Sequence, residues 1–343
     1  MRFSSPAGGV TMVSLGMAVL LIVHLYGLLF IPYLTEIASE TVEIPSGSSV
    51  KQTALILREK GRIPSVPAFI LLTGLTRSQG PVHAGEYKIP EPSSAWQILN
   101  ILRHGSQVLH LVTIPEGMRS ADVAGIMAEK LSLSKARFLA LLTDPVMIRS
   151  LGLDTPSLEG YLMPETYAFH KNMTEEKVIR KMVDGMLAFF DQEKMKRAES
   201  LGMSLHQVLI LASIIEKEAG SEEECPLISS VFHNRLKKHM LLQSDPTVIY
   251  GIKNFDGNLQ ESELKTDGPY NTYLRQGLPP TPIANPGKSS ILAALYPAET
   301  SYLYFVSRND RTHAFSRTLH EHNMAVNRYQ RKRAADSETG SLQ

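Results

Sequence analysis

The sequence predicts an α+β fold with an N-terminal transmembrane helix, a small α/β module and a larger domain of mixed helices and strands. Three observations predict it. An uncharged apolar run lies near the N-terminus, strand and helix patterns alternate directly after it, and a longer region combines amphipathic helices with loops rich in Pro, Gly, Asn and Tyr. Segregated helices and short strands, without a regular βαβ alternation, are typical of α+β architectures.

The composition is that of an ordinary globular protein large enough for two modest domains. The chain has 343 residues, of which 43% are hydrophobic and 20% charged, and its formal net charge is +1. Because it carries no basic block, nucleic acid is excluded as the main partner. A single cysteine, Cys225, cannot form an intrachain disulfide, so the cysteine count does not indicate a compartment.

Residues 10–34 form the predicted membrane anchor. No Lys, Arg, Asp or Glu occurs between Arg2 and Glu36, and a helix of this length can cross a bilayer. A cleaved signal peptide would have a shorter apolar run and a small-x-small cleavage site. Basic charge precedes the run and acidic residues follow it. The positive-inside rule therefore predicts a single pass through the inner (cytoplasmic) membrane. Residues 1–9 lie in the cytoplasm, and the chain that follows the span lies outside it.

Residues 41–107 form the predicted small module. A strand and turn over 41–50 lead into a helix over 51–60, and Gly61 suits the end of that helix. A second apolar helix covers 67–76 and a strand covers 84–89. Ser94 then caps a helix that runs to residue 102. The order is therefore β-α-α-β-α.

Residues 108–330 form the predicted larger domain, and residues 331–343 a polar, flexible tail. The domain opens with a strand over 108–113. Its helix patterns cover 120–131, 134–142, 175–194, 204–219 and 223–238. After Met240 come long loops, including 243–251 and 269–282, and then a strand over 302–306. Long loops inside a folded domain are usually functional or disordered, and the Tyr content argues against disorder.

The helix over 204–219 places Glu218 on a face that we expect to be buried. At about 100° per residue, Glu218 falls beside Ile214 and Ile215. The opposite, solvated side carries the polar residues Ser213, Glu216 and Lys217. A carboxyl on an apolar stripe has a raised pKa, and a general acid must stay protonated near neutral pH. The alternative is that Glu218 ends the stripe at the rim of the core, with its carboxyl in water.

Two loops supply groups that suit carbohydrate binding. Residues 243–251 and 270–273 combine amide, hydroxyl and carboxylate groups with aromatic faces. Ordinary turn chemistry is the alternative, because Asp-Pro and Asn-Thr are common in loops. Glu165, fixed after Pro164, is either a second active-site carboxylate or a helix-capping acid, and we favour the first.

Motifs of the commoner chemistries are missing from the sequence. It contains no Walker A loop, no Gly-x-Gly-x-x-Gly, no Gly-x-Ser-x-Gly and no His-Glu-x-x-His. His320 and His322 are two residues apart, so on a helix they point apart and do not make a metal site. The sequence predicts neither a metal nor an organic cofactor.

Six segments, which occur in the family's order, resemble the YceG-like endolytic murein transglycosylase family, and the resemblance covers nearly the whole chain, including the membrane anchor. They are LEGYLMPETY (158–167), ASIIEKEA (212–219), VFHNRL (231–236), QSDPTVIYG (243–251), YNTY (270–273) and GLPP (277–280). The small module, with GEYKI (85–89), resembles the family's LysM-like subdomain. Two positions depart from the family's pattern: Met163, where an aromatic residue is common, and Ser244, where Thr is common.

The resemblance implies a lytic transglycosylase that cleaves the MurNAc-GlcNAc β-1,4 bond of nascent peptidoglycan strands and leaves 1,6-anhydro-MurNAc ends. It implies Glu218 as the catalytic acid. The motif positions expected to line the glycan cleft are Glu165, Gln243, Asp245, Tyr250, Tyr270 and Asn271. It also implies peptidoglycan as substrate and penicillin-binding protein synthases as partners, with no cofactor.

Three other functions stay open at this point. The first is a hydrolytic muramidase that uses Glu218 as acid and Asp245 or Glu165 as base. The second is a non-catalytic peptidoglycan-binding scaffold, and the third is a membrane-tethered assembly factor. Both non-catalytic alternatives predict that loss of Glu218 changes no glycan product.

Overall fold

The computed structural model is a mixed α/β fold in which most elements are helices and the strands form two-stranded sheets. The structure describes residues 7–33 and 41–331. The predicted cytoplasmic segment 1–9 is therefore described only from Ala7, and the predicted tail 331–343 lies outside the described residues beyond Arg331.

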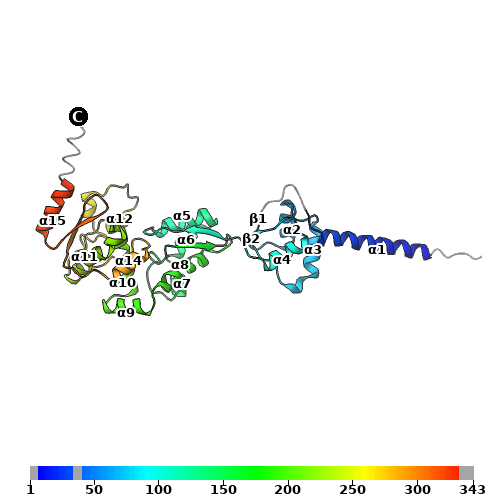
Figure 1. The fold of residues 1–343 in the computed structure, drawn as a ribbon, viewed down its shortest axis with the longest axis horizontal. Helices are drawn as coiled ribbons and strands as arrows, with labels where there is room; N and C mark the ends of the chain where they lie inside the picture. The colour runs from blue at the N-terminus through cyan, green and yellow to red at the C-terminus, as the bar shows by residue number, and fades with distance from the viewer. Residues whose placement is uncertain (1–6, 34–40, 332–343) are drawn as a thin grey trace, which may run out of the picture. The chain divides into compact units, whose positions relative to one another are not determined.

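The chain divides into two compact units. The first comprises Met1–Leu111 and Ala168–Met173, and the second comprises Val112–Tyr167 and Thr174–Gln343. Each unit has its own helices and strands, which Figure 1 colours by position in the chain. We describe the two units separately.

The first unit begins with α1 (Ala7–Phe30), whose apolar side chains are exposed along most of its described length. Its last turn contacts the rest of the unit: Leu29 is buried, and the Phe30 ring lies 6.0 Å from that of Trp96. Within the described residues, no single helix has both the length and the apolar character of a membrane span. One pair of helices bent by 85°, Gln192–Ser200 with Leu205–Glu218, meets those criteria by length and composition alone.

The rest of the first unit is a small sheet covered by three helices. Strands β1 (Thr41–Ile44) and β2 (Gly85–Lys88) pair antiparallel, and the helices are α2 (Val50–Glu59), α3 (Val66–Leu75) and α4 (Ala95–His104). Ser49 and Ser94 each close a capping box with a Gln three residues later, so these helix starts are set locally. The core consists of apolar side chains from all five elements, among them Val42, Leu57, Phe69, Tyr87 and Leu99.

The second unit opens with a group of short elements. They are α5 (Ser120–Leu131), α6 (Lys135–Leu141), α7 (Pro145–Ser150) and α8 (Glu175–Phe189), with β3 (His110–Thr113) and β4 (Thr166–Phe169), two strands whose residues are divided between the two units. Strands β3 and β4 form one sheet, α6 contacts both α5 and α8, and Phe138 of α6 is fully buried.

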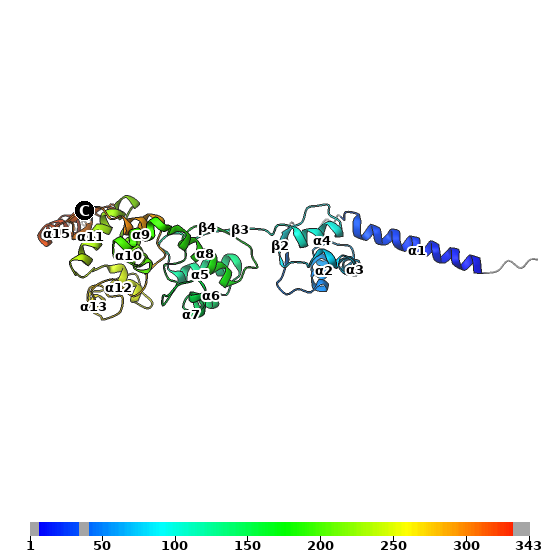
Figure 2. The ribbon, with the colours of Figure 1, turned by 90° about the horizontal axis from the view of Figure 1, so that it is seen from below.

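The remainder of the second unit is built around α10 (Leu205–Glu218). Its other elements are α9 (Gln192–Ser200), α11 (Cys225–Lys237), α12 (Asp245–Gly251), α13 (Glu261–Leu264), α14 (Lys288–Leu295), β5 (Tyr304–Ser307), β6 (His313–Ser316) and α15 (Leu319–Val326). Helix α10 contacts α9, α11, α12 and α14, and Figure 2 shows it near α9, α11 and α12. Strands β5 and β6 pair antiparallel and are contacted by α15.

Two predictions of local structure are wrong. The helix predicted over 175–194 is two helices, α8 and α9, because Asp191 accepts a hydrogen bond from the backbone N–H of Lys194 and starts a new helix. The segment 243–251, predicted as a loop, contains α12. Pro246 occupies the first turn of this helix, where its missing N–H costs nothing.

Candidate functional site

Glu218 is the last residue of α10, the most deeply buried helix of the second unit. Ser204 closes a capping box with Gln207 at the start of the helix, and every residue from Val208 to Ile215 is buried. The predicted solvated side is therefore wrong for Ser213, which is fully buried, donates to the carbonyl of Ile210 and accepts from the N–H of Ile283. A helix buried all round carries its terminal carboxyl to the edge of the core.

The carboxyl of Glu218 has the raised pKa that the sequence predicts. Burial raises its pKa from 4.5 to about 7, and the charge of Asp245 adds to the effect. The hydroxyl of Ser244 donates to Oε1 of Glu218 at 2.5 Å, and this bond and the charge of Arg235 act in the opposite direction. Position at the C-terminal end of a helix further disfavours a negative charge. A substantial fraction of Glu218 is therefore protonated at neutral pH, where an ordinary glutamate is ionised.

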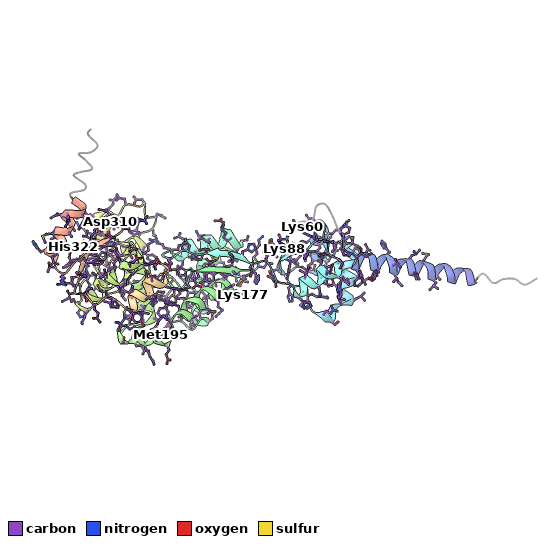
Figure 3. All side chains as sticks on the ribbon, viewed as in Figure 1. Lys60, Lys88, Lys177, Met195, Asp310 and His322 are labelled. Atoms are coloured by element: carbon purple, nitrogen blue, oxygen red, sulfur yellow. The ribbon has the colours of Figure 1, made fainter. Side chains whose placement is uncertain are left out.

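Glu218 lines a cavity of about 440 Å³ in the second unit. The wall includes Gln243 and Asp245 from the segment before and at the start of α12, Arg235 from α11, and residues of β5, β6 and α15. One of these is His322 of α15, labelled in Figure 3, whose ring stacks on Tyr304 with centroids 5.3 Å apart. The cavity therefore joins the acid to amide, carboxylate, guanidinium and aromatic groups.

Arg235 is a fixed positive charge beside this cavity. Its guanidinium donates to the carbonyls of Leu241, Leu242 and Leu303 at 2.7–3.1 Å, and to Oε1 of Gln243 at 3.2 Å. These neutral acceptors hold the side chain without cancelling its charge. Burial lowers the pKa of Arg235 but leaves a guanidinium protonated at any physiological pH.

Gln243 and Asp245 are held by the loop that follows α13. The backbone N–H of Gln243 donates to the carbonyl of Thr272, and the residue has φ of 50°, which is uncommon outside glycine. The hydroxyl of Tyr273 donates to Oδ1 of Asp245 at 2.5 Å. Burial and the carboxylate raise the pKa of Tyr273, so it stays a hydrogen-bond donor. A strained backbone conformation, such as the positive φ of Gln243, is often found at functional sites.

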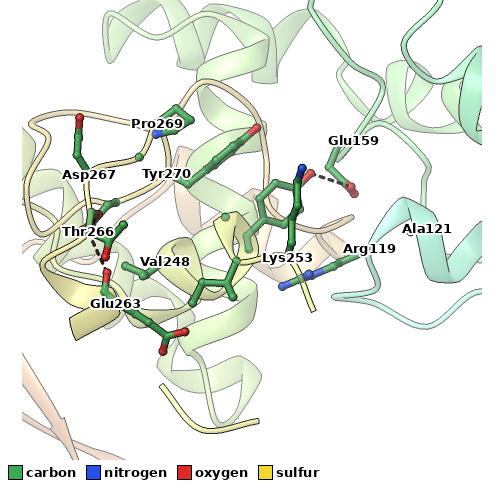
Figure 4. A pocket seen from close by; sticks show the side chains of 15 residues that line it. Arg119, Ala121, Glu159, Val248, Lys253, Glu263, Thr266, Asp267, Pro269 and Tyr270 are labelled. Atoms are coloured by element: carbon green, nitrogen blue, oxygen red, sulfur yellow. Dashed lines mark hydrogen bonds between the residues drawn. The ribbon is translucent and has the colours of Figure 1, made fainter. Parts of the chain in front are cut away.

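Three predicted site residues lie elsewhere. Tyr250, Tyr270 and Asn271 line a second cavity, of about 700 Å³, at the C-terminal end of α12 (Figure 4). Asn271 is buried, and its side-chain amide donates to the carbonyls of Leu264 and Thr266, so it organises the loop. The structure therefore brings Glu218, Gln243 and Asp245 together and places the other three at a separate cavity.

Glu165 lines neither cavity. Its carboxylate lies 2.6 Å from Nζ of Lys288, at the start of α14. Glu216 is close to the same helix start: it accepts hydrogen bonds from the N–H of Gly287 and the hydroxyl of Ser290 at 3.0 and 2.7 Å. The prediction of a solvated Glu216 is wrong, because this carboxylate caps α14.

Several residues beside Glu218 were not predicted from the sequence. The sequence marks Ser244 only as a departure from the family's pattern, whereas its hydroxyl contacts the acid directly. Arg235 and Tyr273 stand inside two quoted motifs, VFHNRL and YNTY, which was the available signal. No sequence signal pointed to His322 as a residue of this cavity, because α15 follows Glu218 by about 100 residues and reaches it only in the folded unit.

Comparisons with known proteins place the chain in a family. Residues 42–328 match the model of the YceG-like family. The chain is 36% identical over 304 residues to a Bacillus subtilis protein named endolytic murein transglycosylase, covering 84% of each. It is 29% identical over 301 residues to a Streptococcus pneumoniae protein of the same name, covering 78% of this chain and 54% of that one. A crystal structure of a yceG-like protein from Listeria monocytogenes is similar, with a TM-score of 0.58 and 35% identity, over 83% of this chain and 97% of that one.

Proposed function

The chain belongs to the YceG-like family, and we propose that it is an endolytic murein transglycosylase whose catalytic acid is Glu218. It cleaves the β-1,4 bond between N-acetylmuramic acid and N-acetylglucosamine in peptidoglycan strands. The observation that carries the assignment of Glu218 is its carboxyl with a pKa of about 7 in the wall of a 440 Å³ cavity. An acid whose pKa lies near the working pH is the best general acid and, once ionised, still a competent base.

The reaction needs one carboxyl in two protonation states. Protonated Glu218 gives its proton to the glycosidic oxygen as the bond from that oxygen to C1 of muramic acid breaks, and the glucosamine end leaves as an alcohol. The carboxylate then takes the proton from the 6-hydroxyl of muramic acid as O6 bonds to C1. The product is a 1,6-anhydro ring, no water is consumed, and Glu218 ends protonated again. This scheme differs from the two-carboxylate mechanisms of most glycosidases.

The neighbours of Glu218 support this cycle. Ser244 donates to Oε1, which leaves Oε2 as the oxygen that carries the proton. Asp245 supplies a negative charge in the same cavity, where positive charge develops on the sugar ring in an oxocarbenium-like transition state. Gln243 and Arg235 supply donors suited to sugar hydroxyl and acetamido oxygens.

A hydrolytic muramidase is the second candidate, because Asp245 shares the cavity of Glu218 and is able to activate a water molecule there. Glu165, the other carboxylate considered for that role, is paired with Lys288 outside the cavity. The two reactions give different products: hydrolysis adds a water molecule to the new chain end, and transglycosylation does not.

The N-terminal part completes the proposal. Residues 10–34 anchor the chain in the inner (cytoplasmic) membrane with residues 1–9 in the cytoplasm, and the exposed apolar side chains of α1, such as Leu20 and Ile22, support this. Residues 41–107 form a LysM-like subdomain, and residues 108–330 form the extracytoplasmic catalytic domain. Such an enzyme cuts nascent strands close to the membrane and works beside penicillin-binding protein synthases.

The test is mass spectrometry of the products from purified glycan strands. The wild-type chain is expected to give ends one water lighter than reducing ends. Glu218→Gln should lower kcat by about 1,000-fold, since an amide cannot exchange the proton. Glu216→Gln is the matched control and should keep cleaving, because Glu216 bonds to Gly287 and Ser290 rather than lining the cavity. Activity that survives in Glu218→Gln and is lost in Glu216→Gln would overturn the assignment.

A further inference from the structure

The second cavity, at the C-terminal end of α12, has no role in the cycle of Glu218. Its volume of about 700 Å³ lies within the range of small-molecule sites. Figure 4 shows Arg119 and Glu159 on one side of it and Thr266, Asp267 and Glu263 on the other. All of these residues belong to the second unit.

One wall of the cavity is aromatic. The rings of Tyr250 and Tyr270 lie edge to face with centroids 4.8 Å apart, and the guanidinium of Arg119 lies 5.0 Å from the centroid of Tyr250. The hydroxyl of Tyr250 donates to Glu159, and that of Tyr270 bonds to the hydroxyl of Thr281. Because both hydroxyls already have partners, the two rings present mainly apolar surface to a ligand. The guanidinium of Arg119 adds a positive charge beside them.

The acidic groups around the cavity are already bonded. Glu159 accepts from the N–H and the hydroxyl of Ser120, both at 2.9 Å, and from Tyr250 at 3.2 Å. Asp267 makes two hydrogen bonds of 3.0 Å with the guanidinium of Arg275. Glu263 accepts from the backbone N–H of Gln260 at 2.7 Å.

The basic groups, by contrast, are available. Arg119 donates to the carbonyl of Ile249 at 3.3 Å and, although its charge acts on Glu159, it forms no ion pair within the described residues. Lys253 is exposed and likewise has no ion pair in the described part of the chain. Among the described residues, Arg119 and Lys253 are therefore two cations without a carboxylate partner, beside two aromatic rings, whereas Asp267 is paired with Arg275 and Glu263 keeps its negative charge.

We propose that this cavity binds the carboxylate-bearing stem peptide of the peptidoglycan strand whose glycan is cleaved at Glu218. The inference rests on the proposed function, because that function supplies the substrate class, peptidoglycan. Helix α12 has seven residues and is about 10 Å long, with Asp245 at the start of the helix and Tyr250 near its end, so the two cavities lie one short helix apart. A stem peptide is attached to muramic acid and combines alkyl groups with free carboxylates. Arg119 binds a carboxylate in a bidentate manner, Lys253 adds a second charge, and the tyrosine rings contact the alkyl groups.

A comparison of two substrates tests the proposal. Cleavage by the full-length chain is measured on strands that carry stem peptides and on strands freed of peptides by an amidase. The wild-type chain should show a KM about tenfold lower for the peptide-bearing strands, the amount expected for a charge-assisted hydrogen bond. Arg119→Gln and Lys253→Gln should bring the ratio of the two KM values toward one. Arg149→Gln and Lys237→Gln, matched changes at exposed positions outside the cavity lining, should leave the ratio unchanged.

A binding experiment separates this inference from the proposed function. The probe is the tripeptide L-alanyl-γ-D-glutamyl-L-lysine, titrated calorimetrically into the inactive Glu218→Gln chain. Binding that is lost in the Glu218→Gln chain carrying Lys253→Gln or Arg119→Gln supports the site. A wild-type KM ratio of one, or peptide binding that survives both changes, overturns it. Peptide binding by a wild-type chain that cleaves neither substrate would instead overturn the proposed function and leave the site standing.

Discussion

Glu218 and Glu159 are two glutamates of the same unit whose pKa is raised by the same cause, burial. Their hydrogen bonds differ. Glu159 accepts from three donors, which satisfy both of its oxygens, whereas Glu218 accepts one hydrogen bond, from Ser244, on Oε1. Within the described residues, Oε2 of Glu218 has no hydrogen-bond partner and is left to its cavity.

This difference separates Glu159, a structural carboxyl, from Glu218, the proposed catalytic acid. A buried carboxyl with all its acceptor sites occupied stabilises the surrounding backbone, and its donors would be left unsatisfied without it. A buried carboxyl with a free oxygen facing a cavity stabilises the fold less, but a substrate in the cavity can reach its proton. Burial alone therefore does not identify the acid.

The largest effect expected from this comparison is on the pH dependence of stability. Because the folded pKa of Glu218, about 7, exceeds its ordinary value of 4.5, the folded chain binds this proton more tightly than the unfolded chain. The free energy of unfolding should therefore fall as pH rises from about 4.5 to 7, by about 3 kcal/mol. Glu218→Gln should remove this slope and be the more stable chain at pH 8. Denaturant unfolding at pH 5 and pH 8 measures it, and equal slopes in both chains would contradict it.

A smaller loss of stability is expected at Glu159. Glu159→Ala leaves the N–H of Ser120 and the hydroxyl of Tyr250 without their acceptor inside the unit, which should lower the free energy of unfolding by about 2 kcal/mol. Glu218→Ala is the matched change and should not destabilise at pH 8. The measurement is again denaturant unfolding, with the midpoint compared at a constant slope. If Glu218→Ala is the less stable of the two chains, Glu159 does not stabilise the fold more than Glu218 does, and the distinction between the two carboxyls is wrong.

The smallest effect concerns Ser244. Its hydrogen bond lowers the pKa of Glu218, so Ser244→Ala should raise that pKa and move the alkaline limb of the kcat profile to higher pH. The lost donor should also reduce kcat by about tenfold, because the carboxyl is no longer held in one orientation. Ser244→Thr keeps the hydroxyl and should behave like the wild type. An alkaline limb that stays in place in Ser244→Ala would show that the bond does not tune the acid.

Much of the local structure could be predicted because its causes are local. The helix starts at Ser49, Ser94 and Ser204 follow from a serine with Gln three residues on, a pattern that satisfies backbone donors within one turn. The short elements α12, α14 and β6 were not predicted. Each is too short to show a period, and long-range contacts stabilise it.

The candidate site could be predicted only in part. The helical wheel selected Glu218 correctly as a carboxyl with a raised pKa, yet it placed Ser213 in solvent, because the wheel assumes one solvated face and α10 has none over Val208 to Ile215. It also could not show that the carboxylate of Glu216 bonds to the start of α14. The motif 158–167 drew attention to Glu165, while its buried carboxylate is Glu159. Both residues are glutamates in one loop, and only their packing distinguishes them.

The sequence by itself determined most of the longer helices, which carboxyl lies at the end of the buried helix, and which motifs place the chain in its family. Only the tertiary structure decided that Asp245 and Tyr250, five residues apart, line different cavities, that Ser244 touches the acid, and that Glu216 caps α14. The physical reason is the distance along the chain over which each interaction acts. Capping and periodicity act within one or two turns, whereas the surroundings of a carboxyl are made by segments that the chain brings together from far apart.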